Sequence, residues 1–249
     1  MSLPTPPTGR LSLLRVTDLL LIVIVVLGGL RVLLPLLGGV STPEPMMGET
    51  TTGSNFTLLV VSVLLQVALT LGALYAVVIR LRGLSWQDLG LVPPPPGSLM
   101  RGLLLAVISI PAIGLINLLV QSLLGSELRN PQIEALSPVA VSPVNYLIMI
   151  LLAGLLVPLV EELAFRGLLQ GWLRERVGAK GAIALSSLIF ALMHGIPALI
   201  PALLLVGGLL AWLYETSGSL WPSVAMHAAF NSIMTTLLYV ALGQGVAVG

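Results

Sequence analysis

The chain has 249 residues, of which 57% are hydrophobic and only 8% are charged, and its mean hydropathy is +1.07. Soluble domains carry about 25% charged residues, so this composition predicts an integral, multi-pass membrane protein in contact with membrane lipids. The net charge of +1 excludes a strongly basic surface for nucleic acid, and the absence of cysteine excludes disulfides, thiolate metal ligands and cysteine nucleophiles.

A transmembrane helix needs about 20 apolar residues, and seven such segments follow one another along the chain. They are residues 13–37, 56–79, 98–124, 143–174, 181–194, 198–214 and 221–242. An eighth short or re-entrant span stays open as an alternative, because Gly- and Pro-rich stretches separate the segments. We expect the first span to be retained, since it is longer than a signal-peptide core. The sequence thus predicts an all-α, polytopic transmembrane helical bundle, with residues 1–142 supplying N-terminal helices and an interfacial segment, and residues 143–242 supplying the core helices.

The loop charges predict the orientation, because basic residues favour the cytoplasmic side. Basic residues precede the first span and lie between the second and third and between the fourth and fifth: Arg10, Arg15, Arg80, Arg82, Arg101, Arg174, Arg176 and Lys180. The alternate loops carry Glu44, Glu49, Glu127, Arg129 and Glu134. We therefore predict a cytoplasmic N-terminus, and the plasma membrane as the location in a prokaryote. The amphipathic segment 81–92 is expected at the cytoplasmic interface.

Five ionisable side chains lie in or at the edge of the apolar segments of the second half. They are Glu161, Glu162, Arg166, His194 and His227. An ionisable group in hydrocarbon costs roughly 2.5–3.5 kcal/mol on insertion scales. Five groups of the types that do acid–base chemistry or bind metal indicate an active site inside a membrane protein.

Helical spacing assigns different parts to the two adjacent acids. Glu162 and Arg166 are four residues apart and are expected to form a structural ion pair. Glu161 is offset by about 100° and is the chemically available carboxylate. With a turn at Gly178, Glu161 lies 17 residues before the turn and His194 lies 16 after it. The two side chains are therefore predicted at nearly the same depth in a helical hairpin.

Each of these features also has a purely structural interpretation. A Glu–Arg pair inside a span is often only structural, and either histidine could simply hydrogen-bond between helices. His227 and Asn231 share a helix face, but polar pairs at this spacing are common. The prediction of a site depends on the set and not on any member.

Several hydrolytic chemistries can be excluded. Asp18 and Asp88 lie near interfaces and outside any polar cluster, which argues against an aspartyl protease, and the spans contain neither Gly-x-Ser-x-Gly nor His-Glu-x-x-His. A carboxylate, two imidazoles and an amide remain. These groups can activate water and stabilise an oxyanion. Alternatively, Glu161, His194 and His227 could bind a divalent metal such as zinc.

The polar residues form three ordered motifs, namely Glu161-Glu162-x-x-x-Arg166, Phe190-x-x-x-His194 and His227-x-x-x-Asn231. These motifs resemble those of the CAAX prenyl protease and bacteriocin-processing (Abi) family of intramembrane endopeptidases. The resemblance covers residues 145–238 and implies a four-helix catalytic core. Eukaryotic members of the family remove the last three residues of prenylated CAAX proteins.

The resemblance implies that Glu161 and His194 activate the hydrolytic water, and that His227 and Asn231 form the oxyanion site. The residues that would support the site are Glu162, Arg166 and Phe190. The family is described both as a metalloprotease and as using a metal-free glutamate mechanism. We favour the metal-free mechanism, because one free carboxylate and two histidines are a minimal ligand set and no further acid is evident to orient them.

The sequence thus predicts a CAAX-type intramembrane endopeptidase that hydrolyses a peptide bond of a membrane-associated or lipidated protein or peptide. In a prokaryote, processing of small peptides is a better expectation than prenylated CAAX substrates. One alternative is a non-catalytic membrane scaffold or bacteriocin-immunity-type protein of the same fold. A proton-coupled transporter is a weaker alternative, because the two halves show no internal symmetry. No oligomeric state follows from the sequence.

Overall fold

The chain is described by a computed structural model, which covers residues 10–38, 52–125 and 142–244. All regular elements in these ranges are helices, so the predicted all-α fold class is confirmed. A 3₁₀ turn, Leu11–Leu13, leads into α1 (Val16–Gly38). Helix α2 (Thr52–Leu74) continues as a π-helix, Tyr75–Leu81, and α3 (Ser98–Leu124) follows. The loop residues Glu44, Glu49, Glu127, Arg129 and Glu134 lie outside the described ranges.

The second half of the chain begins with one long helical stretch whose hydrogen-bond spacing alternates. It consists of α5 (Pro143–Met149), the π-helix η3 (Ile150–Leu156), α6 (Val157–Glu162), the π-helix η4 (Leu163–Gln170) and α7 (Gly171–Met193). A 3₁₀ turn, Pro197–Leu199, precedes α8 (Ile200–Ser217), and α9 (Trp221–Gly243) completes the described part. The π-helical segments, which are rare in proteins and frequent at functional sites, were not predicted from the sequence.

The described residues contain six helical stretches that are long and apolar enough to cross a membrane, one fewer than the seven predicted. The difference arises because residues 143–193 form one continuous stretch. Gly178 interrupts that stretch with φ 73° and ψ 173°, a conformation that only glycine adopts without strain. The chain therefore does turn at Gly178, between the segments predicted as the fourth and fifth spans.

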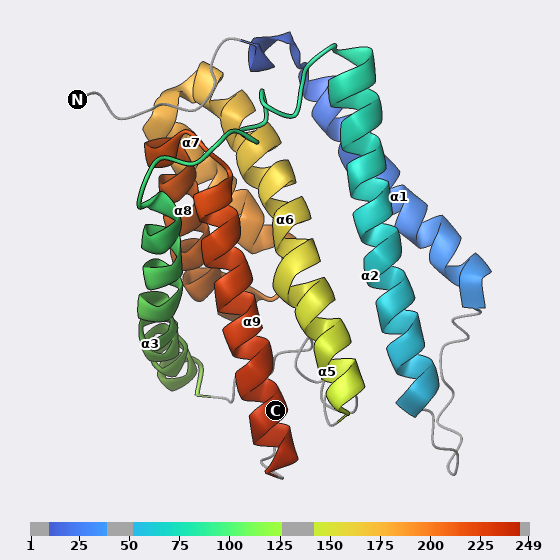
Figure 1. Ribbon diagram of the computed structural model, residues 1–249, viewed down its shortest axis with the longest axis vertical. Coiled ribbons are helices and arrows are strands. Elements are labelled where there is room, and N and C mark those ends of the chain that lie inside the picture. The colour runs from blue at the N-terminus through green and yellow to red at the C-terminus, as the bar shows by residue number, and fades with distance from the viewer. Residues whose placement is uncertain (1–9, 39–51, 126–141, 245–249) are drawn as a thin grey trace.

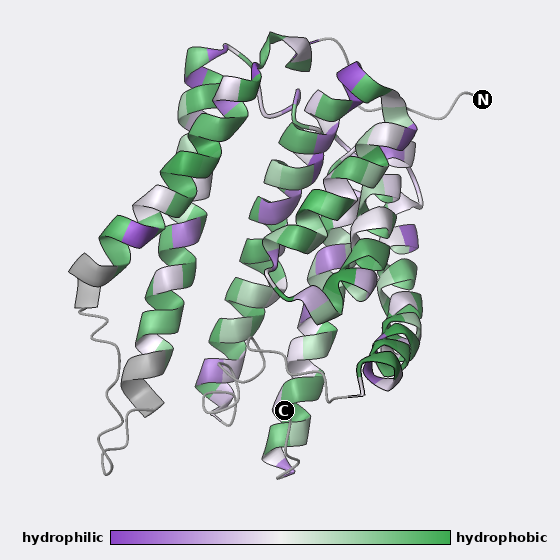
Figure 2. Cartoon of the chain, turned by 180° about the vertical axis from the view of Figure 1, so that it is seen from behind, coloured by the Kyte–Doolittle hydropathy of each residue, from purple (hydrophilic) through white to green (hydrophobic). Residues whose placement is uncertain are grey.

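The helices form a bundle with α6 and α9 near its centre (Figure 1). Helix α9 contacts both α3 and η3, α7 contacts α8, and α1 pairs with α2. Hydrophobic residues run along most of each helix (Figure 2), and many large ones are exposed, as expected for lipid-facing surfaces. The bundle thus satisfies its backbone groups internally and presents an apolar exterior.

The loops predicted to be basic come together at one end of the bundle, which we call the basic end. Arg10 pairs with Asp88 at 3.0 Å, and Arg82 pairs with Asp18 at 2.8 Å. The indole N–H of Trp172 donates to the carbonyl of Leu14 at 3.0 Å, which ties the α7 hairpin to the N-terminal segment. These contacts place the three basic loops on the same side of the helical bundle.

The segment 82–97 closes the basic end and is built of turns. Leu89 is fully buried, and the carbonyl of Gly90 accepts the amide of Leu220 at 2.8 Å. The Ser219 hydroxyl donates to the carbonyl of Val92 at 2.7 Å. A Cβ at Gly167 would lie 2.6 Å from the Leu89 carbonyl oxygen, so only glycine lets this segment pack against the helical stretch from Pro143 to Gly178. We call this stretch the central helix.

Candidate active site

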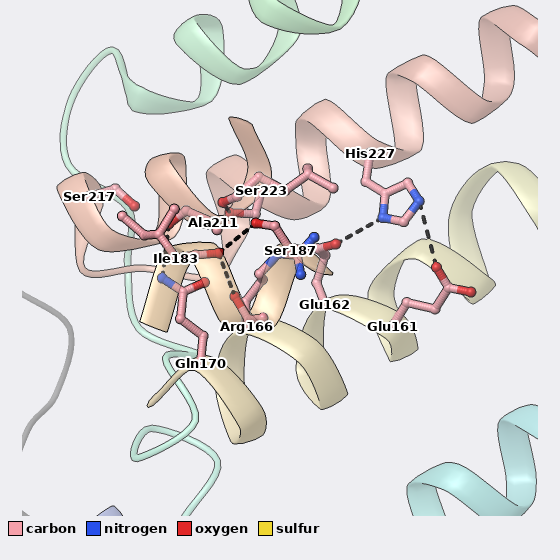
Figure 3. A network of polar contacts seen from close by, with 12 residues as sticks. Glu161, Glu162, Arg166, Gln170, Ile183, Ser187, Ala211, Ser217, Ser223 and His227 are labelled. Atoms are coloured by element: carbon pink, nitrogen blue, oxygen red, sulfur yellow. Dashed lines mark hydrogen bonds and ion pairs between the residues drawn. The ribbon is translucent and has the colours of Figure 1, made fainter. Parts of the chain in front are cut away.

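The two adjacent acids lie at the end of α6, between the π-helices η3 and η4, and they face the two ring nitrogens of His227 on α9 (Figure 3). The described structure thus brings residues 65 positions apart in the sequence into direct contact inside the bundle. The contact exists because α6 and α9 pack against each other.

Glu162 forms the centre of a buried charged chain. Its Oε2 lies 3.2 Å from Arg166 Nε, and both side chains are fully buried. Its other oxygen, Oε1, lies 2.9 Å from Nδ1 of His227. The predicted contact between Glu162 and Arg166 is therefore present. Glu162 also forms a hydrogen bond with His227, which helical spacing did not predict.

The bond to Glu162 determines how His227 presents its ring. A carboxylate accepts hydrogen bonds, so the Nδ1–H of His227 is the donor, and in the neutral ring Nε2 then carries the lone pair. Nε2 lies 3.7 Å from Glu161 Oε2, beyond direct hydrogen-bond length. A separation of this kind leaves room for a bridging water. Glu161 is also 23% exposed while Glu162 is fully buried, so only Glu161 is accessible to solvent or substrate.

His194 occupies a neighbouring position, separated from His227 by a phenyl ring. Its Nδ1 lies 2.8 Å from the carbonyl oxygen of Phe190, which can only accept, so Nε2 is again the free nitrogen. The Phe190 ring lies 4.7 Å from the His194 ring and 5.9 Å from that of His227, both edge-on. Phe190 is itself buried and lies 4.8 Å beneath the Arg166 guanidinium. This ring therefore spaces the two histidines and covers the buried cation.

The arrangement differs from the pairing implied by the motif resemblance. In the described structure the imidazole beside Glu161 belongs to His227 and not to His194. The depth argument compared only distances from the turn at Gly178. It contained no information about which helix, α7 or α9, faces the Glu161 side of α6.

Asn231 also has a partner that the sequence did not indicate. Its side-chain Nδ2 donates to the backbone carbonyl of Ala153 at 3.1 Å, across the contact between α9 and η3. One of its two N–H groups is thus occupied, and the amide group has a second N–H for another acceptor. The packing is close, since a Cβ at Gly154 would lie 2.5 Å from the hydroxyl of Ser232.

A polar row along the central helix extends the site toward the basic end. Glu162, Arg166, Gln170 and Arg174 follow one another at four-residue spacing. Gln170 is fully buried and donates to the carbonyl of Ala211 at 3.0 Å, while Arg174 pairs with Glu215 at 2.7 Å. The spacing of Gln170 is visible in the sequence and could have identified it as an inward-facing residue. Nη1 and Nη2 of Arg166 and Oε1 of Gln170 are buried and have no hydrogen-bond partner among the described residues. Buried polar atoms of this kind are usually satisfied by ordered water.

A divalent metal was the open alternative for Glu161, His194 and His227. Among the described residues, no three His, Cys, Asp or Glu side chains are grouped as metal ligands would be. The bonds of His227 Nδ1 to Glu162 and of His194 Nδ1 to the Phe190 carbonyl would each suit a metal ligand, but the described side chains do not converge as a set of three. The residues as arranged do not fit a metal site, and no step below uses one.

The chain was compared with families of known proteins. Residues 143–233, which contain all the side chains described above, match the family model described as type II CAAX prenyl endopeptidase, Rce1-like. Residues 143–233 are therefore similar to an Rce1-like type II CAAX prenyl endopeptidase domain. No curated protein and no solved structure matches the chain significantly.

The long apolar helices indicate an integral membrane protein, and the match relates residues 143–233 to a family of membrane proteases. The matched range begins at the proline that opens α5 and ends two residues after Asn231. The three ordered motifs thus correctly indicated the family.

Proposed function

We propose that this protein is a CAAX-type intramembrane endopeptidase in which Glu161 activates water for attack on a peptide bond. The observation that carries the proposal is the row of contacting side chains Glu161–His227–Glu162–Arg166. Of its two carboxylates, only that of Glu161 is accessible. This is the arrangement of a base, an imidazole and a buried group that orients the imidazole.

The reaction follows from the free atoms of the site. A water bound at the Glu161 carboxylate, within reach of His227 Nε2, gives a proton to Glu161 while its oxygen bonds to the scissile carbonyl carbon. The second N–H of Asn231 donates to the oxyanion that forms. When the tetrahedral intermediate collapses, the C–N bond breaks and the proton on Glu161 passes to the leaving nitrogen. His194 Nε2 is a second proton acceptor at the same site.

The resemblance and the geometry assign His227 differently. The resemblance places it in the oxyanion site. Its Nδ1–H is committed to Glu162, so the ring has no further N–H in the neutral form, and we assign Nε2 to the water. His227→Gln tests the assignment, because glutamine can donate to an oxyanion but is a poor proton acceptor. We expect His227→Gln to lose as much activity as His227→Ala. Partial rescue by glutamine would favour the oxyanion role.

The substrate is proposed to be a membrane-associated or lipidated peptide, because the accessible carboxylate lies within an apolar bundle. The site is expected to open toward the cytoplasmic face, where the basic loops gather. A quenched fluorescent peptide with a farnesylated C-terminal CAAX sequence is one probe, and the same peptide without the lipid is its control. A library of unmodified membrane peptides covers the alternative that short processed peptides are the substrates.

The decisive experiment compares purified, detergent-solubilised wild type with Glu161→Gln on these probes, with a strong chelator as a third arm. We expect wild-type cleavage, a loss of about 10²–10⁴-fold in Glu161→Gln, and no effect of chelator. Glu215→Gln, a carboxylate at the basic end, is the matched control and should retain activity. Cleavage retained by Glu161→Gln would contradict the mechanism, and inhibition by the chelator would contradict its metal-free form. If Glu161→Gln leaves the cellular phenotype unchanged, the scaffold alternative is favoured.

A further inference from the structure

Ala153, one turn before Pro158 in the central helix, has a backbone carbonyl that receives no amide from its own helix. In an α-helix its donor would be the amide of Val157, but that amide donates to Leu152 in the π-helix η3. With π spacing the donor would be the amide of residue 158. Residue 158 is proline, which has no N–H.

The carbonyl left free in this way is the one that binds Asn231. The Asn231 Nδ2 donates to it at 3.1 Å. The adjacent Gly154 lets α9 approach, because a Cβ there would lie 2.5 Å from the Ser232 hydroxyl and would force that hydroxyl to move. The bond is partly buried, and a backbone carbonyl shielded from water without a donor is costly, so the interaction satisfies the helix and holds the amide at the same time.

We propose that Pro158 is a positioning residue for the active site. By withholding a backbone N–H, it reserves the Ala153 carbonyl for one N–H of Asn231 and so directs the other N–H to the substrate oxygen. The inference deepens the proposed function and depends on it for the catalytic consequence. The hydrogen-bond exchange itself depends only on the backbone geometry.

Pro158→Ala tests the exchange because it supplies the missing donor. If η3 keeps its π spacing, the new amide of residue 158 reaches the Ala153 carbonyl. If the segment relaxes to an α-helix, the amide of Val157 reaches it. In both cases the backbone competes with Asn231 for one acceptor, and the substitution does not shorten a side chain at the site. Pro201→Ala is the matched control, since Pro201 is exposed in the first turn of α8, where a helix needs no amide donor.

The first readout is independent of catalysis. The chain contains five asparagines, so selective ¹⁵N-asparagine labelling of the whole protein in detergent gives few side-chain amide signals. Asn231→Ala identifies the signal of Asn231. We expect this signal to shift and to exchange faster with solvent in Pro158→Ala, and to stay unchanged in Pro201→Ala. An unchanged Asn231 signal in Pro158→Ala would overturn the inference.

The second readout is kinetic and uses the farnesylated CAAX peptide. Losing an oxyanion donor lowers kcat by about 10²–10³-fold, which is the expectation for Asn231→Ala. For Pro158→Ala we expect about a tenfold loss in kcat with KM unchanged. In the Asn231→Ala background, Pro158→Ala should have no further effect, because both changes act through one amide. A loss that multiplies in the double variant would show that Pro158 acts elsewhere and would overturn the positioning role.

The two readouts separate this inference from the proposed function. A shifted Asn231 signal with full activity in Asn231→Ala would overturn the oxyanion role of Asn231 while supporting the carbonyl exchange. Loss of activity in Glu161→Gln and Asn231→Ala, combined with an unchanged signal in Pro158→Ala, would support the proposed function and overturn the inference.

Discussion

The buried site and the basic end both contain carboxylates paired with cations, yet they place those pairs in opposite surroundings. Glu162 and Arg166 are fully buried, and His227 is only 5% exposed. At the basic end the paired side chains are more exposed to solvent, and Arg10 is 55% exposed. Charge interactions strengthen and charge desolvation becomes costly as the dielectric falls. The comparison predicts that the same residue types contribute strongly to stability in the buried region and weakly at the basic end.

Breaking the buried pair should produce the largest effect on stability. Arg166→Met leaves Glu162 buried beside His227 without its cation, and losing one partner of a buried pair costs about 3–5 kcal/mol. We expect the free energy of unfolding, measured by SDS titration in mixed micelles, to fall by this amount. The double variant Glu162→Gln/Arg166→Met should recover part of the loss. A stability of Arg166→Met equal to wild type would contradict the buried network.

The second-largest loss of stability is expected when the contact between Gly167 and Leu89 is broken, which joins the central helix to the basic end. Gly167→Ala places a methyl group 2.6 Å from the Leu89 carbonyl oxygen, so the 82–97 segment or the central helix must shift. Overpacking of this kind costs about 1–3 kcal/mol. Gly114→Ala in α3, where nothing lies within 4 Å, is the control and should be neutral or slightly stabilising. Equal stabilities of the two variants in the same unfolding titration would argue against close docking of the segment.

Breaking a pair at the basic end should matter least to stability. Arg174→Ala removes the contact with Glu215, and partly exposed pairs contribute about 0.2–1 kcal/mol. The effect should shrink further as salt is raised, because exposed charges are screened. A loss of stability as large as that of Arg166→Met, or a loss that does not depend on salt, would contradict the difference proposed between the two regions.

The orientation of the basic end can be tested without perturbing stability. The natural chain has no cysteine, so Lys180→Cys and Gln244→Cys each create a single thiol. We expect a membrane-impermeant maleimide added outside cells to label Gln244→Cys and not Lys180→Cys, since basic loops favour the cytoplasm. The reverse pattern would place the basic end and the opening of the site outside.

Much of the architecture was predictable because it depends on local chemistry. Long apolar runs predicted the spans, the basic loops indicated their common end, and Gly178 marked the turn between the fourth and fifth segments. The contact of Glu162 with Arg166 followed from helical spacing, because side chains four residues apart share a face. The six-stretch count differs from seven only because residues 143–193 count as one stretch, although the chain turns at Gly178 within it.

The chemistry of the site required knowledge of which helices face each other. Depth from a turn placed Glu161 and His194 at one level, but only the packing of α9 on α6 brings His227 between the two acids. Likewise, the sequence contains Pro158 and Asn231 without relating them. The π spacing of η3 and the close approach at Gly154 bring the free carbonyl of Ala153 to Asn231.

The sequence by itself determined that this protein is a helical membrane bundle and which residue types its site would use. Those properties follow from the cost of placing polar groups in hydrocarbon, which each segment bears on its own. The tertiary structure alone decided which carboxylate is accessible, which imidazole lies beside it and which carbonyl binds the Asn231 amide. Those outcomes depend on hydrogen bonds between segments distant in the chain, and no local pattern encodes the partner of a side chain on another helix.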